Sequence, residues 1–259
     1  MMEALFPLLK SHPGLSVVLF FLVFRVLHVL LQNLPVPKVV RHDGFRSWKW
    51  KNISLSMLHS LLSATWSVTC LVVWPEMLSD IHYHTPISYL LVCVSTGYFV
   101  HDACDIILSG YARGSWEFLL HHALVIWTFL YTLFTRLYLA GAVIALLVEV
   151  NSVTLHFRML LKLAGAQNSS IYYIHKFVNL ATYFTFRLSA QFYLTWYIGV
   201  NYSSLVHGAY FLASLILMNI MIGIYLYRLL RTDFFSGTGR SATVQNGTHN
   251  NNVKKFLSD

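Results

Sequence analysis

Charged residues are scarce in this sequence. Only 11% of its 259 residues are Asp, Glu, Lys or Arg, whereas 56% are hydrophobic. A soluble domain has about 25% charged residues, so the shortage of charge argues against a soluble fold and indicates that much of the surface faces lipid. We therefore expect an integral membrane protein.

Cysteine and proline are also scarce. The three cysteines, Cys70, Cys93 and Cys104, lie inside apolar runs and form no CxxC pair, which argues against a disulfide framework and against a thiolate zinc site. All six prolines precede residue 87. Because proline is the residue that most often kinks a helix, the later helices are expected to be largely unkinked.

Long apolar runs are abundant. A helix needs about 20 apolar residues to cross the hydrocarbon core, and seven runs approach or exceed this length. They lie near residues 14–31, 53–74, 86–108, 116–134, 137–163, 171–199 and 205–230. The first is the weakest because it carries Arg25 and His28. A retained helix is favoured there over a cleaved signal peptide, whose apolar region is only about 7–15 residues long.

The net charge of +8 lies between the apolar runs, as is typical of the cytosolic flanks of membrane helices rather than of a nucleic-acid-binding patch. Basic residues concentrate in segment 32–52, at the adjoining ends of the fifth and sixth runs and after the seventh. Loops 75–85 and 200–204 contain none. The positive-inside rule therefore predicts a multi-pass protein with a cytosolic C-terminus.

Ionisable side chains inside the apolar runs are the most informative residues, because each costs at least about 2.5–3.5 kcal/mol at the bilayer centre. In the third run, Tyr98, His101, Asp102 and Asp105 cluster, and spacings of three and four place the last three on one helical face. These side chains either line an internal cavity or lie where the helix end meets the lipid headgroups.

The fourth run begins with Glu117, His121 and His122. A carboxylate four residues before a histidine can fix its tautomer and raise its basicity, so His121 is a candidate general base oriented by Glu117. His122 points about 100° further round the helix, and at most one of the two histidines is expected to do chemistry. The alternative is that both only hydrogen-bond their neighbours.

Polar residues also interrupt the fifth and sixth runs. Glu149 lies deep in the fifth run with Asn151 two residues later, and Arg187 lies in the sixth. Arg187 is the expected counter-ion of Glu149 or of Asp102 and Asp105, because a buried unpaired guanidinium is costly. Such a pair is either purely structural or part of a site for a lipid phosphate.

Several membrane-enzyme signatures are absent. The histidine pair is flanked by Leu120 and Ala123 rather than forming the Asp-His-His-Cys motif of protein palmitoyltransferases, and no HxxxxD acyltransferase motif starts at His101 or His121. The histidine boxes of iron-dependent desaturases are missing too. No metal or other cofactor is expected; a weaker alternative is a metal site formed by His101, Asp105, His121 and His122.

The order of these motifs resembles a known family. It comprises Gly97-Tyr98-Phe99-Val100-His101-Asp102, Trp116-Glu117 with His121-His122, Leu147-Val148-Glu149-Val150-Asn151 and Phe186-Arg187-Leu188. Together they are similar to the TLC domain, the family of ceramide synthases and the translocating-chain-associated membrane protein. The Arg-x-Trp-Lys-Trp sequence at 46–50 and the segment 229–234 resemble the subgroup of TLC domain-containing proteins 1 and 2.

The resemblance implies an all-α membrane protein: a six-helix TLC-type transmembrane barrel around a lipid-accessible cavity, plus one N-terminal helix. Four segments follow. They are a hydrophobic helix or signal-like segment at 1–31, a basic cytosolic linker at 32–44, the TLC domain at 45–232, and a cytosolic tail at 233–259 whose polar composition predicts disorder.

The resemblance also implies roles for residues. His121 and His122 correspond to the catalytic histidines of ceramide synthases, whereas Glu149 and Asn151 stand where that motif continues with paired aspartates, which argues against sphingoid-base acylation. A lipid headgroup would be held by seven residues, namely Tyr98, His101, Asp102, Asp105, Glu149, Asn151 and Arg187.

Two functions are compatible with the resemblance. The first is a regulator of membrane phospholipid acyl composition and fluidity, which limits incorporation of long polyunsaturated chains and binds a phospholipid or acyl chain. The second is an acyltransferase with acyl-CoA as co-substrate, a lysophospholipid or lipid amine as acceptor, and a histidine base. The resemblance favours the plasma membrane, with the endoplasmic reticulum as the alternative.

Overall fold

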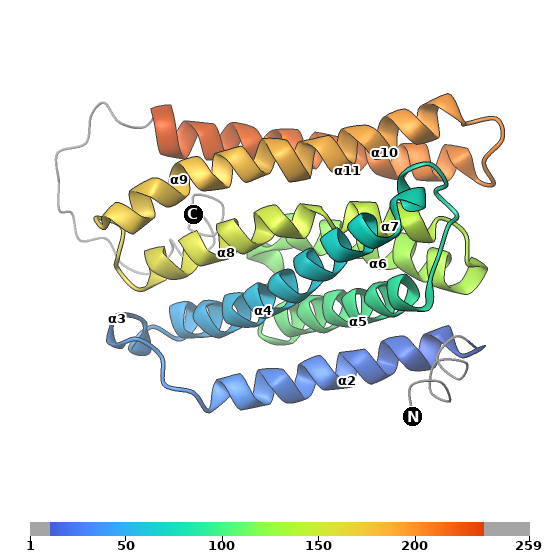
Figure 1. The fold of residues 1–259 in the computed structure, drawn as a ribbon. Coiled ribbons are helices and arrows are strands. Elements are labelled where there is room, and N and C mark those ends of the chain that lie inside the picture. Colours follow the sequence, from blue (N-terminus) through green and yellow to red (C-terminus); the bar gives the residue numbers. More distant parts are fainter. Residues whose placement is uncertain (1–10, 236–259) are drawn as a thin grey trace.

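The computed structural model describes residues 11–235, and this part of the chain is built from helices without strands (Figure 1). Most of the tail predicted to be disordered lies outside the described residues. The elements are α2 (Pro13–Gln32), α3 (Lys38–Arg41), α4 (Gly44–Val73), η1 (Pro75–Leu78), α5 (Pro86–Leu108), η2 (Ala112–Gly114), α6 (Trp116–Thr135), α7 (Leu139–Ala145), α8 (Val148–Leu163), α9 (Ser170–Thr182), η3 (Tyr183–Leu188), α10 (Ser189–Val200), α11 (Gly208–Leu230) and η4 (Arg231–Phe235).

Within residues 11–235, six helical stretches are long and apolar enough to cross a membrane. They are 13–32, 44–73, 86–108, 116–135, 139–163 and 208–235. The remaining apolar run forms α9, η3 and α10, which follow one another without a break and lie in line across the molecule (Figure 1). The predicted all-α, multi-pass membrane fold is confirmed.

The later helices are less regular than the absence of proline predicted. The fifth apolar run divides into α7 and α8 at residues 146–147, where the amide of Glu149 donates to the carbonyl of Leu146, three residues back. The sixth contains the π-helical segment η3. Proline causes neither irregularity, and π-helical turns often occur at functional sites. Both irregular segments carry residues of the candidate site, Glu149 and Arg187.

The two ends of the bundle differ in charge. One end holds α3, the α5–α6 and α8–α9 connections and the C-terminal end of α11 (Figure 1), and we call it the basic end. Its basic residues include Lys38, Arg41, Arg113, Lys162 and Arg231. In the described connections at the opposite end, residues 74–85, 136–138 and 201–207, Arg136 is the only Lys or Arg.

Helix α5 forms the centre of the bundle. It packs against α2, α4, α6 and α7, and 72% of its most apolar stretch is buried, compared with 17% for α11. A helix that is buried on all sides must satisfy its polar side chains through its neighbours. The ionisable residues of α5, His101, Asp102 and Asp105, therefore lie inside the protein.

Helix α2 approaches α5 most closely at Gly97. A Cβ atom at this position would lie 2.7 Å from the Cβ of Phe20 and 2.8 Å from the backbone nitrogen of Phe21. Small residues allow such close helix contacts in membranes. The first apolar run is therefore a helix packed into the bundle, and Gly97 determines how closely it can approach.

We expect Gly97→Ala to lower the free energy of unfolding by about 1–3 kcal/mol, the usual cost of overpacking. The measurement is thermal unfolding of the purified protein in detergent. Gly223→Ala is the matched control, because Gly223 is also helical but a methyl group attached to its Cα would meet no neighbouring atom within 4 Å. Equal unfolding midpoints for the two variants would contradict the close contact between α2 and α5.

Candidate functional site

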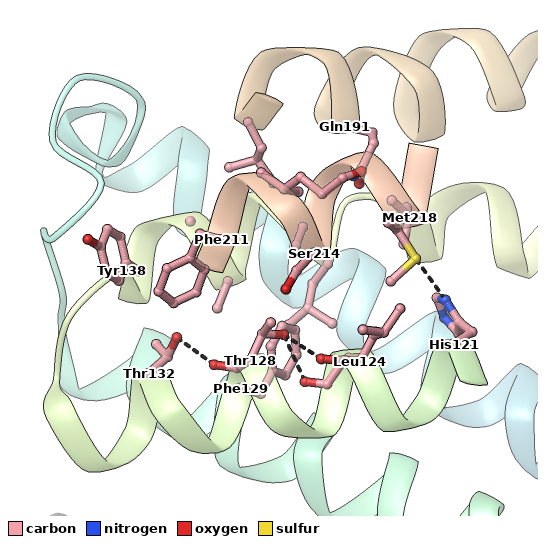
Figure 2. A pocket seen from close by; sticks show the side chains of 18 of the residues that line it. His121, Leu124, Thr128, Phe129, Thr132, Tyr138, Gln191, Phe211, Ser214 and Met218 are labelled. Atoms are coloured by element: carbon pink, nitrogen blue, oxygen red, sulfur yellow. Dashed lines mark hydrogen bonds between the residues drawn. The ribbon is translucent and has the colours of Figure 1, made fainter. Parts of the chain in front are cut away.

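An internal cavity of about 120 Å³ lies among α6, α7, α10 and α11, with the start of α8 and η3 at one end. Figure 2 shows residues of α6 on one side, including Leu124, Thr128 and Thr132, and Phe211, Ser214 and Met218 of α11 on the other. Most of the wall is apolar. Four polar residues gather at what we call the polar end of the cavity: His121, Glu149, Arg187 and Gln191.

His121 reaches the polar end from the first turns of α6. Its Nδ1 lies 3.1 Å from the sulfur of Met218 on α11 (Figure 2). A thioether sulfur is only a weak acceptor, so this contact favours the tautomer with the proton on Nδ1. The lone pair then resides on Nε2, which forms no hydrogen bond within the described residues.

Glu149 and Arg187 lie in the same wall but are held by different neutral groups. The hydroxyl of Ser60 donates to Glu149 at 2.6 Å. Arg187 donates from Nε to Asn151 at 2.8 Å and from a terminal nitrogen to Ser152 at 2.9 Å. Within the described residues Arg187 forms no ion pair. Since a guanidinium has five N–H donors, three remain for an anionic ligand.

His122 faces away from the cavity, towards α5. Its Nε2 lies 3.1 Å from a carboxylate oxygen of Asp102, and its Nδ1 lies 2.6 Å from the carbonyl oxygen of Phe118. Two acceptors flank the ring, so an ionised Asp102 requires protons on both ring nitrogens. His122 and Asp102 are thus a buried imidazolium–carboxylate pair, and His122 has no lone pair left for base catalysis.

Asp102 and Asp105 are joined by a single amide. The side-chain nitrogen of Asn52 donates to Asp102 at 2.7 Å and to Asp105 at 3.1 Å, and the indole N–H of Trp48 donates to Asp105 at 3.0 Å. His28 of α2 lies 3.6 Å from the other oxygen of Asp105. This aspartate cluster, formed by the five residues named here, links α2, α4 and α5 beside the cavity rather than lining it.

Three other predicted headgroup residues also stay outside the cavity wall. Tyr98 stacks on His59 with ring centroids 3.8 Å apart, and His101 is only 1% exposed beside the rings of Phe21 and His28. Asn151 donates to Asn179 and Thr182 while accepting from Arg187; its role is to position that guanidinium. Of the seven predicted headgroup residues, the cavity is lined by Glu149 and Arg187.

Glu117 does not orient His121. Its carboxylate accepts two hydrogen bonds from Arg228 of α11, at 2.6 and 2.9 Å. The i, i+4 spacing made a contact with His121 possible, but the guanidinium offers two parallel charge-assisted bonds, which are stronger. Met218 takes the place that the sequence suggested for Glu117.

Sequence reasoning missed several residues of both sites. Met218, Thr128 and Ser214 line the cavity, and His28, Trp48 and Asn52 complete the aspartate cluster. Trp48 and Asn52 are four residues apart and so share a helix face, a signal that could have found them. Of the four residues of the weaker metal-site alternative, His121 lines the cavity and Asp105 belongs to the aspartate cluster, whereas His122 pairs with Asp102 and His101 lies beside Phe21 and His28. No group of three or more residues that could hold a metal ion occurs among the described residues.

A sequence model of the TLC domain matches residues 49–231. The chain belongs to the TLC domain family. Human TLC domain-containing protein 1 is 42% identical over 86% of this chain and 91% of its own length. The chicken protein of that name is 45% identical over 78% and 81%, and zebrafish TLC domain-containing protein 2 is 38% identical over 83% and 87%. No solved structure matches.

These relationships confirm the resemblance to the TLC family and its subgroup. The two histidines that suggested the family occupy different environments in this member, one in the cavity wall and one in a buried ion pair. Helix α2 lies outside the matched segment, yet it contributes His28 to the aspartate cluster. The physical unit around the site is therefore larger than the matched domain.

We expect Asp102→Ala to cost about 3–5 kcal/mol of unfolding free energy, because it leaves a buried imidazolium unpaired. In a His122→Phe background the same substitution should cost clearly less. The measurement is a double-mutant cycle by unfolding in detergent. The control cycle is Glu117→Ala with Arg228→Ala, a more exposed pair with an expected coupling below about 1 kcal/mol. Equal coupling energies in the two cycles would refute the buried ion pair.

Proposed function

We propose that this TLC family member regulates the acyl composition and fluidity of membrane phospholipids by binding lipid in its intramembrane cavity. The observation that carries the proposal is the composition of that cavity, an apolar space that ends at His121, Glu149 and Arg187. An acyl chain fits the apolar wall, and a carboxyl, ester or phosphate group fits the free donors of Arg187.

The size of the cavity bears on which chains it accepts. At about 120 Å³ it is similar to cavities of about 150 Å³ that hold a single benzene ring, so it takes part of one chain unless the helices move apart. Several cis double bonds bend an acyl chain repeatedly. A narrow space between helices favours straight chains over such chains, which is consistent with a protein that limits incorporation of long polyunsaturated chains.

We place the protein in the plasma membrane with its C-terminus in the cytosol; the endoplasmic reticulum is the alternative. The concentration of Lys and Arg at the basic end supports this orientation. The polar end of the cavity lies on the side of α6 nearer to the basic end, since His121 follows the start of α6 by five residues. The cavity would then draw on lipids of the cytosolic leaflet.

A large side chain that fills the cavity should abolish the effect of the protein on phospholipid composition. Thr128→Trp places an indole in the cavity. When it is expressed in cells that lack the endogenous protein, we expect this variant, unlike the wild type, not to lower the content of polyunsaturated phospholipids. Leu120→Trp is the control, because Leu120 lies on the same helix, is exposed and does not line the cavity. The measurement is lipid mass spectrometry at matched expression. An unchanged effect of Thr128→Trp would count against lipid binding in this cavity.

The second candidate function is acyl transfer, in which His121 would be the reacting residue. With its proton on Nδ1, Nε2 can accept a proton from a lysophospholipid hydroxyl or lipid amine, or attack an acyl-CoA thioester and release coenzyme A as the thiol. In the second route the acyl-imidazole then passes the acyl group to the acceptor. Arg187 would bind the phosphate of either substrate.

One assay separates the two functions. The purified protein is supplied with acyl-CoA and lysophosphatidylethanolamine, and wild type is compared with His121→Ala. Acyl transfer requires a loss of about 10²–10⁴-fold on removal of the base. Met218→Leu is the matched control, since it removes only the weak acceptor. We expect no turnover by the wild type and a preserved cellular effect of His121→Ala; robust transfer that depends on His121 would establish an enzyme instead.

A further inference from the structure

Helices α6 and α11 pack against each other over only a short stretch. The two helices face each other across the cavity (Figure 2) and meet through a few side-chain pairs. From the basic end these are Glu117 with Arg228, Phe118 stacked on Tyr225, His121 with Met218, and Tyr131 with Phe211 and His207. By contrast, α5 packs along much of its length against α2 and α6.

Both helices present apolar side chains to the outside next to this seam. Trp127 of α6 is 64% exposed, and Ile224 of α11 is 44% exposed. Inside the seam, Leu124 and Leu215 line the cavity. One layer of side-chain contacts thus separates the apolar outer surface beside the seam from the apolar cavity.

At the basic end, α6 and α11 are joined by a partly exposed ion pair. Glu117 and Arg228 have side-chain exposures of 16% and 39%, so solvent and charged headgroups can compete for their hydrogen bonds more easily than for those of a buried pair. Beside it, the hydroxyl of Tyr225 is buried and has no hydrogen-bond partner in the described structure. A phosphate that arrived there could take over the guanidinium of Arg228 and accept from Tyr225, which offsets the loss of Glu117.

A second Arg–carboxylate pair shows the contrast. Arg158 of α8 binds Asp233 of η4, with side-chain exposures of 11% and 2%, and also donates to Tyr172. This pair is more buried, has an additional partner and does not border the cavity. The Arg158–Asp233 pair holds the C-terminal end of α11 and η4 against α8. The Glu117–Arg228 pair, at the neighbouring turn, can separate while this contact stays in place.

We propose that the seam between α6 and α11 is a lateral portal through which an acyl chain of a bilayer phospholipid reaches the cavity, and that Glu117–Arg228 is its latch. The proposal rests on the proposed lipid-binding function and adds the route and the residues that control it. Opening separates Glu117 from Arg228 and unstacks Phe118 from Tyr225. The chain then slides between the helices while its phosphate stays at the basic end with Arg228.

The test follows lipid access in nanodiscs of unlabelled phosphatidylcholine. Phosphatidylcholine with a diazirine near the end of one acyl chain is added from vesicles, samples are illuminated at successive times, and cross-links to α7 are quantified by mass spectrometry. Arg228→Glu places two carboxylates together and should raise the rate of labelling about threefold to tenfold. The exchange Glu117→Arg with Arg228→Glu should restore the wild-type rate, and Asp233→Asn, the control at the second pair, should leave it unchanged.

A disulfide provides an independent arm. Phe118→Cys with Tyr225→Cys should give a form in which oxidation slows labelling of α7 at least tenfold and reduction restores it. Equal labelling rates in the latch variants, and no effect of oxidation on a formed disulfide, would overturn the portal while leaving lipid binding intact. Absence of α7 labelling in the wild type even at long times would overturn lipid binding and the portal together.

Discussion

The pair between His122 and Asp102 is the interaction on which the site depends. Two charges buried among α4, α5 and α6 are tolerable only because each satisfies the other, while Asn52 donates to the second oxygen of Asp102 and Nδ1 of His122 donates to the carbonyl of Phe118. The pair also fixes the rotation of α6 about its axis. Because adjacent helical residues point about 100° apart, holding His122 against α5 turns His121 towards the cavity.

Arg187 is likewise held in position by hydrogen bonds to residues of a neighbouring helix. The π-helical segment η3 presents the guanidinium to α8, where Asn151 and Ser152 hold it, and Asn151 is in turn fixed by Asn179 and Thr182. None of these partners is charged. Arg187 is therefore oriented by neutral groups, so its charge remains available at the polar end of the cavity. An arginine already committed to a carboxylate would have no such capacity.

The sequence was sufficient to predict the helices and insufficient to predict their partners. Apolar runs of bilayer length identified the spans, because lipid demands that backbone groups be satisfied within each segment. Helical spacing also identified which residues share a face. It could not tell which distant element meets that face: Glu117 had a plausible partner four residues away, yet it binds Arg228, 111 residues away. Met218 carries no charge or motif, so no sequence signal links it to His121.

The aspartate cluster extends beyond the N-terminal boundary of the segment that matches the TLC domain. The TLC match begins at residue 49, whereas Trp48 and the α2 residue His28 contact Asp105. Asp102 has His122 as counter-charge within the matched domain, whereas Asp105 accepts hydrogen bonds from Trp48 and Asn52 and lies 3.6 Å from His28 of α2, whose close approach depends on Gly97. Burying two carboxylates side by side is costly unless both are compensated. The first helix, which seemed the weakest span because it carries His28, is joined to the bundle through that same residue.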